Sequence, residues 1–220
     1  MIPMQYDTLR QTMIDTQIRT WEVLDTRVLG SLAQIKREIF VPTPLRHLAF
    51  ADFQIPLEHG EQMWTPKMEA RVLQELDLDT KDRVLEIGTG TGYLTALLAH
   101  LGGMVHSVED HADMLRMAEG RLHLQGVQNI HLHHGDGSEG WASHAPYDAI
   151  CITGSLPALP TAFLDQLGPG GRMVAILGTS PAMRVRRYVR DRGGTVRQTD
   201  LFETEIRPLR HHIHEPAFQF

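Results

Sequence analysis

The sequence predicts a doubly wound α/β fold with a mostly parallel sheet, and two observations carry this prediction. From residue 83 onward, short apolar segments alternate with longer segments of helical periodicity. A cluster of glycines separates the first apolar segment from the helix that follows it. Alternation at this spacing is typical of βαβ units, whose helices cover both faces of a parallel sheet. The 220 residues suffice for one sizeable domain of this kind.

The elements follow in order along the chain. Residues 5–40 have the apolar periodicity of helices, with Asp25 as a candidate N-cap, and a further helix begins at Pro66 with Thr65 as its N-cap. The expected strands are 83–87, 104–109, 129–133, 147–153 and 172–177, the last preceded by a glycine-rich turn, with helices at 93–101 and 112–125. Alternation around Gly193-Gly194 predicts a C-terminal β-hairpin of residues 183–192 and 195–208. We expect an N-terminal helical segment, residues 1–80, packed on a ligand-binding domain, residues 81–220, as one compact unit.

Charge and composition argue against several classes of protein. The net charge of −6 disfavours a non-specific nucleic-acid binder, which needs a basic surface. The arginine run from Arg184 to Arg192 is interleaved with apolar residues and is expected on the solvated face of an edge strand. No segment reaches the ~18 consecutive apolar residues of a membrane span, and the first residues lack the features of a signal peptide. The sequence therefore predicts a cytoplasmic protein, with no membrane partner and little to favour nucleic acid.

The glycine cluster lies in residues 86–93, which read Glu-Ile-Gly-Thr-Gly-Thr-Gly-Tyr. Closely spaced glycines between a strand and a helix let the backbone approach a ligand, and ligands collect at the carboxyl ends of parallel strands. A dinucleotide site would have Gly-x-Gly-x-x-Gly, with a pyrophosphate on the helix N-terminus. Here Tyr93 takes the place of the last glycine, and Glu86 suits a cationic group better than a pyrophosphate. The amino group of S-adenosylmethionine is such a group.

Two further acids follow successive strands. Glu109 ends the second expected strand and can accept hydrogen bonds from both ribose hydroxyls, and Asp136 follows the third and can bond an adenine amine. Three acids at three successive strand ends, together with the loop, predict a nucleoside-sulfonium site. The expected S-adenosyl-L-methionine-binding residues, with S-adenosyl-L-homocysteine as the product, are Glu86, Gly88, Thr89, Gly90, Gly92, Tyr93, Glu109, Asp136 and Gly137.

Beyond the loop, nearly the whole chain resembles the protein-L-isoaspartate O-methyltransferase family. The resemblance includes Arg37-Glu38-Ile39-Phe40-Val41-Pro42, Ala49-Phe50-Ala51-Asp52, Gly135-Asp136-Gly137 and Ala145-Pro146-Tyr147-Asp148. It implies the fold of class I S-adenosylmethionine-dependent methyltransferases and transfer of a methyl group to the α-carboxylate of L-isoaspartyl residues in proteins. Because a carboxylate is already ionised at pH 7, such a reaction needs mainly alignment and exclusion of water.

The segment that resembles the family's acceptor motif departs from it. Residues 55–66 keep the frame of Pro56, Gly60 and Pro66, but Gln62 stands where the family has Thr, and Trp64 where it has the catalytic Ser. An indole donates a hydrogen bond and accepts none, and it is much larger than a hydroxyl. The expected acceptor-side residues, Gln62, Trp64 and Thr65, lie in the segment 1–80 and predict an altered methyl acceptor, such as an unidentified small molecule.

Other functions remain open. In one, the chain repairs isoaspartyl proteins in the orthodox way, with Thr65 and backbone groups replacing the lost serine. In another, of a different class, it binds S-adenosylmethionine without catalysis. Histidine pairs such as His131 and His133, or His212 and His214, lack the partner patterns of a zinc site, so no metal is predicted.

Overall fold

The structure of the chain, a computed structural model, describes residues 6–212, and of His212 the backbone alone. The helices are α1 (Tyr6–Met13), α2 (Thr26–Gln34), α3 (Arg37–Phe40), α4 (Pro66–Leu76), α5 (Tyr93–Leu101), α6 (Ala112–Leu124) and α7 (Thr161–Gln166). The strands are β1 (Ile55–Pro56), β2 (Gln62–Met63), β3 (Arg83–Ile87), β4 (Met104–Glu109), β5 (Ile130–His134), β6 (Tyr147–Leu156), β7 (Leu167–Thr179), β8 (Ala182–Arg190) and β9 (Val196–Thr204). Within these residues no helix is long and apolar enough to cross a membrane.

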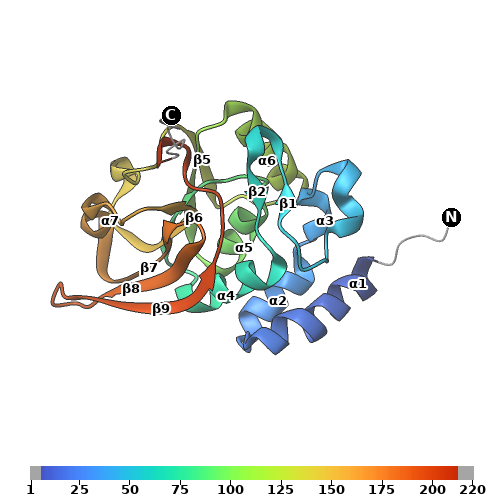
Figure 1. Cartoon of the computed structure of the whole chain (residues 1–220), viewed down its shortest axis with the longest axis horizontal. Coiled ribbons are helices and arrows are strands. Elements are labelled where there is room, and N and C mark those ends of the chain that lie inside the picture. The colour runs from blue at the N-terminus through green and yellow to red at the C-terminus, as the bar shows by residue number, and fades with distance from the viewer. Residues whose placement is uncertain (1–5, 213–220) are drawn as a thin grey trace, which may run out of the picture.

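Seven strands form one sheet in the order β5-β4-β3-β6-β7-β8-β9 (Figure 1). The first five strands, β5 to β7 in this order, are parallel to one another. Strand β8 is antiparallel to β7, and β9 is antiparallel to β8. The expected α/β fold with a C-terminal hairpin is therefore confirmed. Alternate residues of the inner strands enter two separate cores, one on each face of the sheet. Helices α4, α5 and α6 cover one face, whereas α7 packs on the other.

The prediction of a glycine-rich turn before the fifth strand is wrong. Residues 168–171 lie inside β7, where the pairing with β6 shifts register between Tyr147 and Ala149. A Cβ at Gly171 would lie 2.8 Å from the carbonyl oxygen of Gly168. The glycines therefore permit a bulge that begins β7 earlier than the apolar residues indicate.

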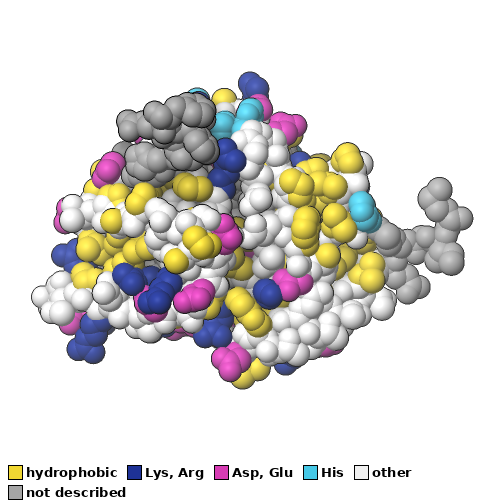
Figure 2. Space-filling view, viewed as in Figure 1, with side chains coloured by type: hydrophobic (Ala, Val, Ile, Leu, Met, Phe, Trp, Pro, Cys, Tyr) yellow, Lys and Arg dark blue, Asp and Glu magenta, His cyan; other side chains and the backbone are white. Residues whose placement is uncertain are grey.

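The arginine-rich strand β8 is not an edge strand, because it pairs with β7 on one side and β9 on the other. Figure 2 shows basic side chains over the β8–β9 hairpin, with acidic side chains among them. Arg184 and Arg186 form ion pairs with Asp200, and Arg187 with Glu75. These arginines are largely neutralised within the chain.

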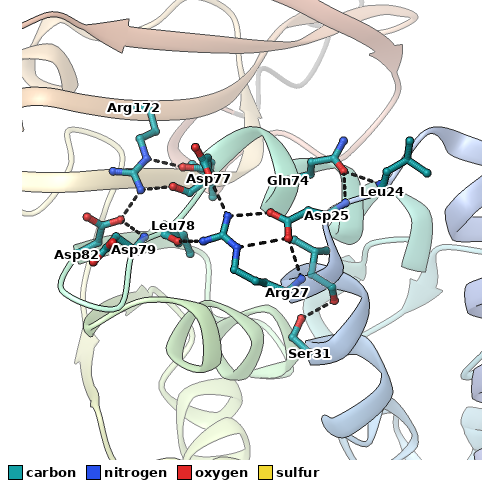
Figure 3. Close-up of polar contacts among 12 residues, drawn as sticks. Leu24, Asp25, Arg27, Ser31, Gln74, Asp77, Leu78, Asp79, Asp82 and Arg172 are labelled. Atoms are coloured by element: carbon teal, nitrogen blue, oxygen red, sulfur yellow. Dashed lines mark hydrogen bonds and ion pairs between the residues drawn. The ribbon is translucent and has the colours of Figure 1, made fainter.

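The N-terminal helices lie against the helical face of the sheet, where α2 packs on α4 and α5. Asp25 caps α2 by accepting from the backbone amide of Arg27, as expected. The Arg27 guanidinium donates to Asp77 and to the Leu78 carbonyl, and Arg172 from β7 reaches Asp77 and Asp82 (Figure 3). Arginines from distant parts of the chain therefore meet at the end of α4 and tie α2 to the sheet.

Candidate active site

A cavity opens at the carboxyl ends of the parallel strands, the usual ligand site of doubly wound sheets. Three parts of the chain line it. The first is the set of loops after the strands, which contributes Gly88–Thr91, Glu109–His111 and Gly135–Ser138. The second is the β1–β2 hairpin with Trp64, and the third is the segment Ile206–His211. The cavity is thus walled by residues from the middle and the last part of the described chain.

The loop after β3 approaches β6 so closely that it requires glycine. Gly88 has φ +94°, and a Cβ on it would lie 2.1 Å from Oγ1 of Thr153. The Thr153 hydroxyl donates to the carbonyl of Ile87 at 2.7 Å, which fixes it in that position. Any side chain at residue 88 would push the loop into the cavity.

Glu109 lies at the end of β4 with its carboxylate held by backbone amides. Gly90 N donates to one oxygen at 2.9 Å, and His111 N donates to the other at 3.0 Å. The Gly90 amide is therefore occupied by a carboxylate of the chain itself and is not free for a phosphate. The loop presents an acid to the cavity, which suits a ligand that carries hydroxyls or a positive charge.

Asp136 provides a second carboxylate in the cavity, on the loop after β5. One of its oxygens accepts from the amide of Ser138 at 2.8 Å. The next residue, Gly137, packs so tightly on the strand below that a Cβ would lie 2.9 Å from the Ile87 side chain. Gly88, Thr89, Gly90, Glu109, Asp136 and Gly137 thus all line the cavity, as a cofactor site would require.

Three residues of the expected cofactor set lie behind the loop and do not line the cavity. The Glu86 carboxyl is fully buried and accepts hydrogen bonds from Thr95 and Ser107, each at 2.6 Å. Burial raises the pKa of Glu86 to about 8, so the group is mostly neutral at pH 7. Gly92 starts α5 with φ +86° and packs on α6, and the buried Tyr93 ring lies against Phe40. Their contribution to the site is to shape the loop from beneath.

Trp64 lines the cavity and has 6% of its surface exposed. Its indole Nε1 donates to the carbonyl of Thr153 at 3.0 Å, the residue that also contacts Gly88. Its backbone carbonyl accepts from Nη2 of Arg37 at 2.7 Å. Arg37 is fully buried and forms an ion pair with buried Glu69. Trp64 is therefore held from both its ring and its backbone.

The neighbours of Trp64 differ in what they offer. Gln62 lines the cavity on the exposed side of β2. The Thr65 hydroxyl is the N-cap of α4, where it accepts from the amide of Met68 at 3.4 Å, and Thr65 does not line the cavity. One alternative from the sequence had the Thr65 hydroxyl replace the lost serine. In the structure, this hydroxyl caps α4 instead.

The segment 206–211 was not anticipated as a wall of the site. Its first residues were predicted to continue the hairpin to residue 208, but β9 ends at Thr204. The segment joins β6 through backbone bonds between Ser155 and residues Arg207 and Leu209. Arg207 lies 3.3 Å from Glu61, and Arg210 lies 3.0 Å from Asp110. Burial still raises the pKa of Glu61, although Arg207 opposes the shift. No periodicity or motif in the sequence indicates that this segment returns to the site.

The β1–β2 hairpin is also fixed at its tip. His59 Nε2 lies 2.8 Å from Asp113 at the start of α6, and the His59 ring stacks on His111 at 4.1 Å between ring centroids. His111 lines the cavity. The hairpin is therefore held across the cavity beside Glu109.

The sequence model of the protein-L-isoaspartate(D-aspartate) O-methyltransferase family matches residues 8–212. A protein-L-isoaspartate O-methyltransferase of Koribacter versatilis (strain Ellin345) is 41% identical over 202 residues, 91% of this chain and 90% of its own length. The chain belongs to this family. A relative of the same name from Methanoculleus marisnigri is 40% identical and is matched over 84% of each chain.

Solved structures agree with this membership. A protein-L-isoaspartate O-methyltransferase superposes with a TM-score of 0.76 at 25% identity, over 90% of this chain and 65% of that one. A Plasmodium falciparum protein described by the same activity, solved with S-adenosyl-L-homocysteine, has a TM-score of 0.78 over 93% of this chain and 98% of its own. Its 17% identity supports the fold alone. As a member of the protein-L-isoaspartate O-methyltransferase family, the protein is an S-adenosylmethionine-dependent methyltransferase.

Proposed function

We propose that S-adenosylmethionine lies against the glycine loop with its ribose hydroxyls on Glu109 and its adenine amine on Asp136. Both carboxylates face the cavity from adjacent strand ends, and the backbone amides of Gly90 and His111 fix the first. The absence of a side chain at Gly88 and Gly90 leaves room for the ligand at the loop. Glu86, Gly92 and Tyr93 then support this loop from behind rather than contact the ligand.

We infer that the methyl acceptor enters between Trp64 and the segment 206–211, and that it differs from an isoaspartyl α-carboxylate. The observation that carries this inference is the indole of Trp64, which fills the position where the family resemblance expects a serine hydroxyl. Its only polar atom is already bonded to Thr153, and the Thr65 hydroxyl next to it caps α4. The indole, together with Leu57 and Met63, therefore gives this part of the cavity an apolar lining.

The reaction asks for alignment rather than acid or base help from the chain. When bound, S-adenosylmethionine would supply an electrophilic methyl on its sulfonium and leave as S-adenosylhomocysteine. An acceptor that reaches the cavity as an ionised nucleophile has no proton to lose, so the chain would need only to align it with the methyl group. The rigid anchoring of Trp64 by Thr153 and Arg37 gives the acceptor a fixed surface. Glu61 and Arg207 form an ion pair at the same wall and supply the polar groups that an acceptor would meet.

Orthodox isoaspartyl methylation is the second candidate, and Arg207 and Arg210 favour it. Both line the cavity, and a guanidinium can bind a carboxylate in two hydrogen bonds. Each is engaged with an acid of the chain, Glu61 and Asp110 respectively. A carboxylate substrate would have to compete with these acids.

The test measures transfer of labelled methyl to an L-isoaspartyl peptide, with the matching aspartyl peptide as control and cofactor binding followed by calorimetry. We expect tight cofactor binding, slow transfer in the wild type, and faster transfer in Trp64→Ser. Trp64→Phe keeps the ring without the bond to Thr153 and should stay slow. Rapid isoaspartyl-specific transfer by the wild type would contradict the altered acceptor. Binding with no release of S-adenosylhomocysteine in cell extract would instead identify a non-catalytic binder.

A further inference from the structure

A group of histidines lies at the β5 edge of the sheet, outside the cavity. His106 on β4 pairs in register with His131 on β5, and His133 follows two residues later on the same face. His144, in a short 3₁₀ helix (Ala142–His144), stacks on His106 at 4.2 Å between ring centroids. This is the face on which α7 packs, and the 3₁₀ helix is the only helix between β5 and β6 in the described chain. The imidazoles occupy the edge that a longer helix would otherwise cover.

The ring nitrogens are close enough to share one ion. Nδ1 of His106 lies 3.1 Å from Nε2 of His133, and one nitrogen from each of His106, His133 and His144 lies within 4.8 Å of the others. Zinc–imidazole bonds of ~2.0–2.1 Å at tetrahedral angles place ligand nitrogens about 3.3–3.4 Å apart. The two strand histidines are already near that spacing, and a modest rotation of the exposed His144 would complete the set.

The cluster has no acidic partner in the described part of the chain. Among the side chains of residues 6–211, the histidines that form ion pairs with acids are His59 and His211, and neither belongs to this group. Neutral imidazoles packed together can form hydrogen bonds with one another. If they were protonated further, no paired carboxylate would compensate their positive charge. Neutral imidazole is a preferred ligand of zinc, copper and nickel. A divalent transition metal is the partner that this donor set suits best.

The position of the cluster links it to the cofactor side of the cavity. His133 is two residues before Gly135, where the segment lining the cavity begins, and His144 follows the same segment. Between them, the Trp141 ring lies 5.2 Å from the His133 ring, and a Cβ on Gly135 would lie 3.1 Å from Trp141. A metal bound to both histidines would therefore join the two ends of the loop that carries Asp136.

We propose that His106, His133 and His144 bind one divalent metal of the zinc class, with the fourth position open to His131 or water. The metal fixes residues 135–144 and thereby the carboxylate of Asp136. The role is structural and lies apart from the methyl transfer itself. It differs from the prediction of no metal, which rested on sequence pairs and did not include His106 or His144.

The test uses the full chain without an affinity tag, stripped by a chelator and titrated with Co²⁺, whose visible absorption reports coordination. We expect one equivalent to bind, to be displaced by Zn²⁺, and to bind at least about tenfold more weakly in His133→Ala and in His144→Ala. His144 is exposed, so His144→Ala should fold normally, as circular dichroism would verify. His123→Ala, at an exposed position on α6, is the matched control and should bind like the wild type.

Two other histidine groups need their own variants. His59, His111 and Asp113 also have ligand atoms within 4.8 Å of one another, and His214 and the side chain of His212 lie outside the described residues. Loss of binding in His59→Ala or in His212→Ala/His214→Ala, but not in His133→Ala, would overturn the assignment, as would no binding at all. Zn²⁺ should also tighten S-adenosylmethionine binding in the wild type and leave His144→Ala unaffected. Metal binding without that change would refute the link to Asp136.

Discussion

The two sides of the cavity are built differently. On the proposed cofactor side, the groups that line the cavity are backbone positions and two carboxylates, all within a few residues of parallel strand ends. On the proposed acceptor side, Trp64 is held by Arg37 from the N-terminal helices and by Thr153 from β6, and residues 206–211 also line the cavity. The first side depends on local conformation, and the second depends on long-range contacts.

The difference shows where this fold tolerates change. A glycine loop that fits one ligand leaves little freedom, because Gly88 has no room for a side chain beside Thr153. The acceptor wall is a set of side chains on a fixed frame, so one substitution can alter its chemistry without moving the backbone. We propose that Trp64, in the position where the family resemblance predicts a serine, is such a substitution.

The largest effect is expected from Arg37→Leu, which tests how far the acceptor wall depends on buried charge. The change leaves Glu69 buried without its partner and removes the bond to the Trp64 carbonyl. Loss of one member of a buried ion pair costs about 3–5 kcal/mol of unfolding free energy. Denaturant unfolding would measure this loss, and Arg37→Leu/Glu69→Leu should recover part of it. A loss below about 1 kcal/mol would show that the pair does not support the wall.

Glu86→Gln should change the pH dependence of stability while leaving cofactor affinity nearly unchanged. The folded-state pKa of Glu86, about 8, lies above its ordinary value of 4.5, so folding takes up a proton between those values. The stability that this carboxyl supports is full below pH 4.5 and is lost as the pH rises toward 8. As the pH rises through that range, the free energy of unfolding of the variant should therefore increase relative to that of the wild type by roughly 1.4 kcal/mol per pH unit.

Unfolding curves at several pH values, with calorimetric titration of S-adenosylmethionine beside them, would measure both effects of Glu86→Gln. A parallel pH dependence in variant and wild type would refute the raised pKa. A cofactor affinity reduced more than about tenfold would return Glu86 to the ligand-binding set, since a charge-assisted hydrogen bond contributes about 1.5–3 kcal/mol.

Gly88→Ala probes the cofactor side with the smallest possible side chain. Its Cβ would collide with Thr153 Oγ1 at a backbone conformation of positive φ, which costs of order 1–3 kcal/mol. We expect S-adenosylmethionine affinity to fall by about 10- to 100-fold, measured by calorimetry. Gly120→Ala on exposed α6, where a Cβ meets nothing within 4 Å, should leave affinity unchanged. Equal affinities in both variants would show that the loop is not the cofactor site.

The smallest effect is expected from His59→Asn, which keeps a residue that tolerates the left-handed conformation at this position. The variant loses the contacts of the hairpin tip with Asp113 and His111. Because both side chains of the ion pair are exposed, the melting temperature should hardly change. Stopped-flow release of S-adenosylmethionine should be roughly threefold faster if the hairpin retains the ligand. Unchanged release would mean that the hairpin does not cover the ligand.

Much of the fold could be predicted because local sequence features indicate where strands and helices begin and end. The strands 83–87 and 104–109 and the helix 93–101 have the predicted bounds, each set by glycines or by a change of hydrophobic period. The bulge at Gly168–Gly171 was missed, because glycines that permit a bulge and glycines that form a turn look alike in sequence. The inner position of β8 depends on its pairing with β9. The alternation of apolar and polar residues along a strand does not indicate which strands pair with it.

For the site, the residues found from sequence are those that follow strand ends. Gly88, Glu109 and Asp136 line the cavity because topology brings parallel strand ends together. The same reasoning could not separate Glu86, which points beneath the loop, from acids that face the ligand. Arg207 and the histidine cluster depend on contacts between distant segments. The residue assignments, the division at residue 80 and a cytoplasmic location stay predictions.

The return of residues 206–211 to β6 has a consequence for how the enzyme is made. The ribosome releases these residues after every strand of the sheet, yet they form one wall of the cavity and are bonded to Ser155. A growing chain that has completed β9 already contains the glycine loop and both carboxylates, but the pocket still lacks a side. The enzyme therefore becomes competent only after residues 206–211 have been made and have reached the strand made some fifty residues before.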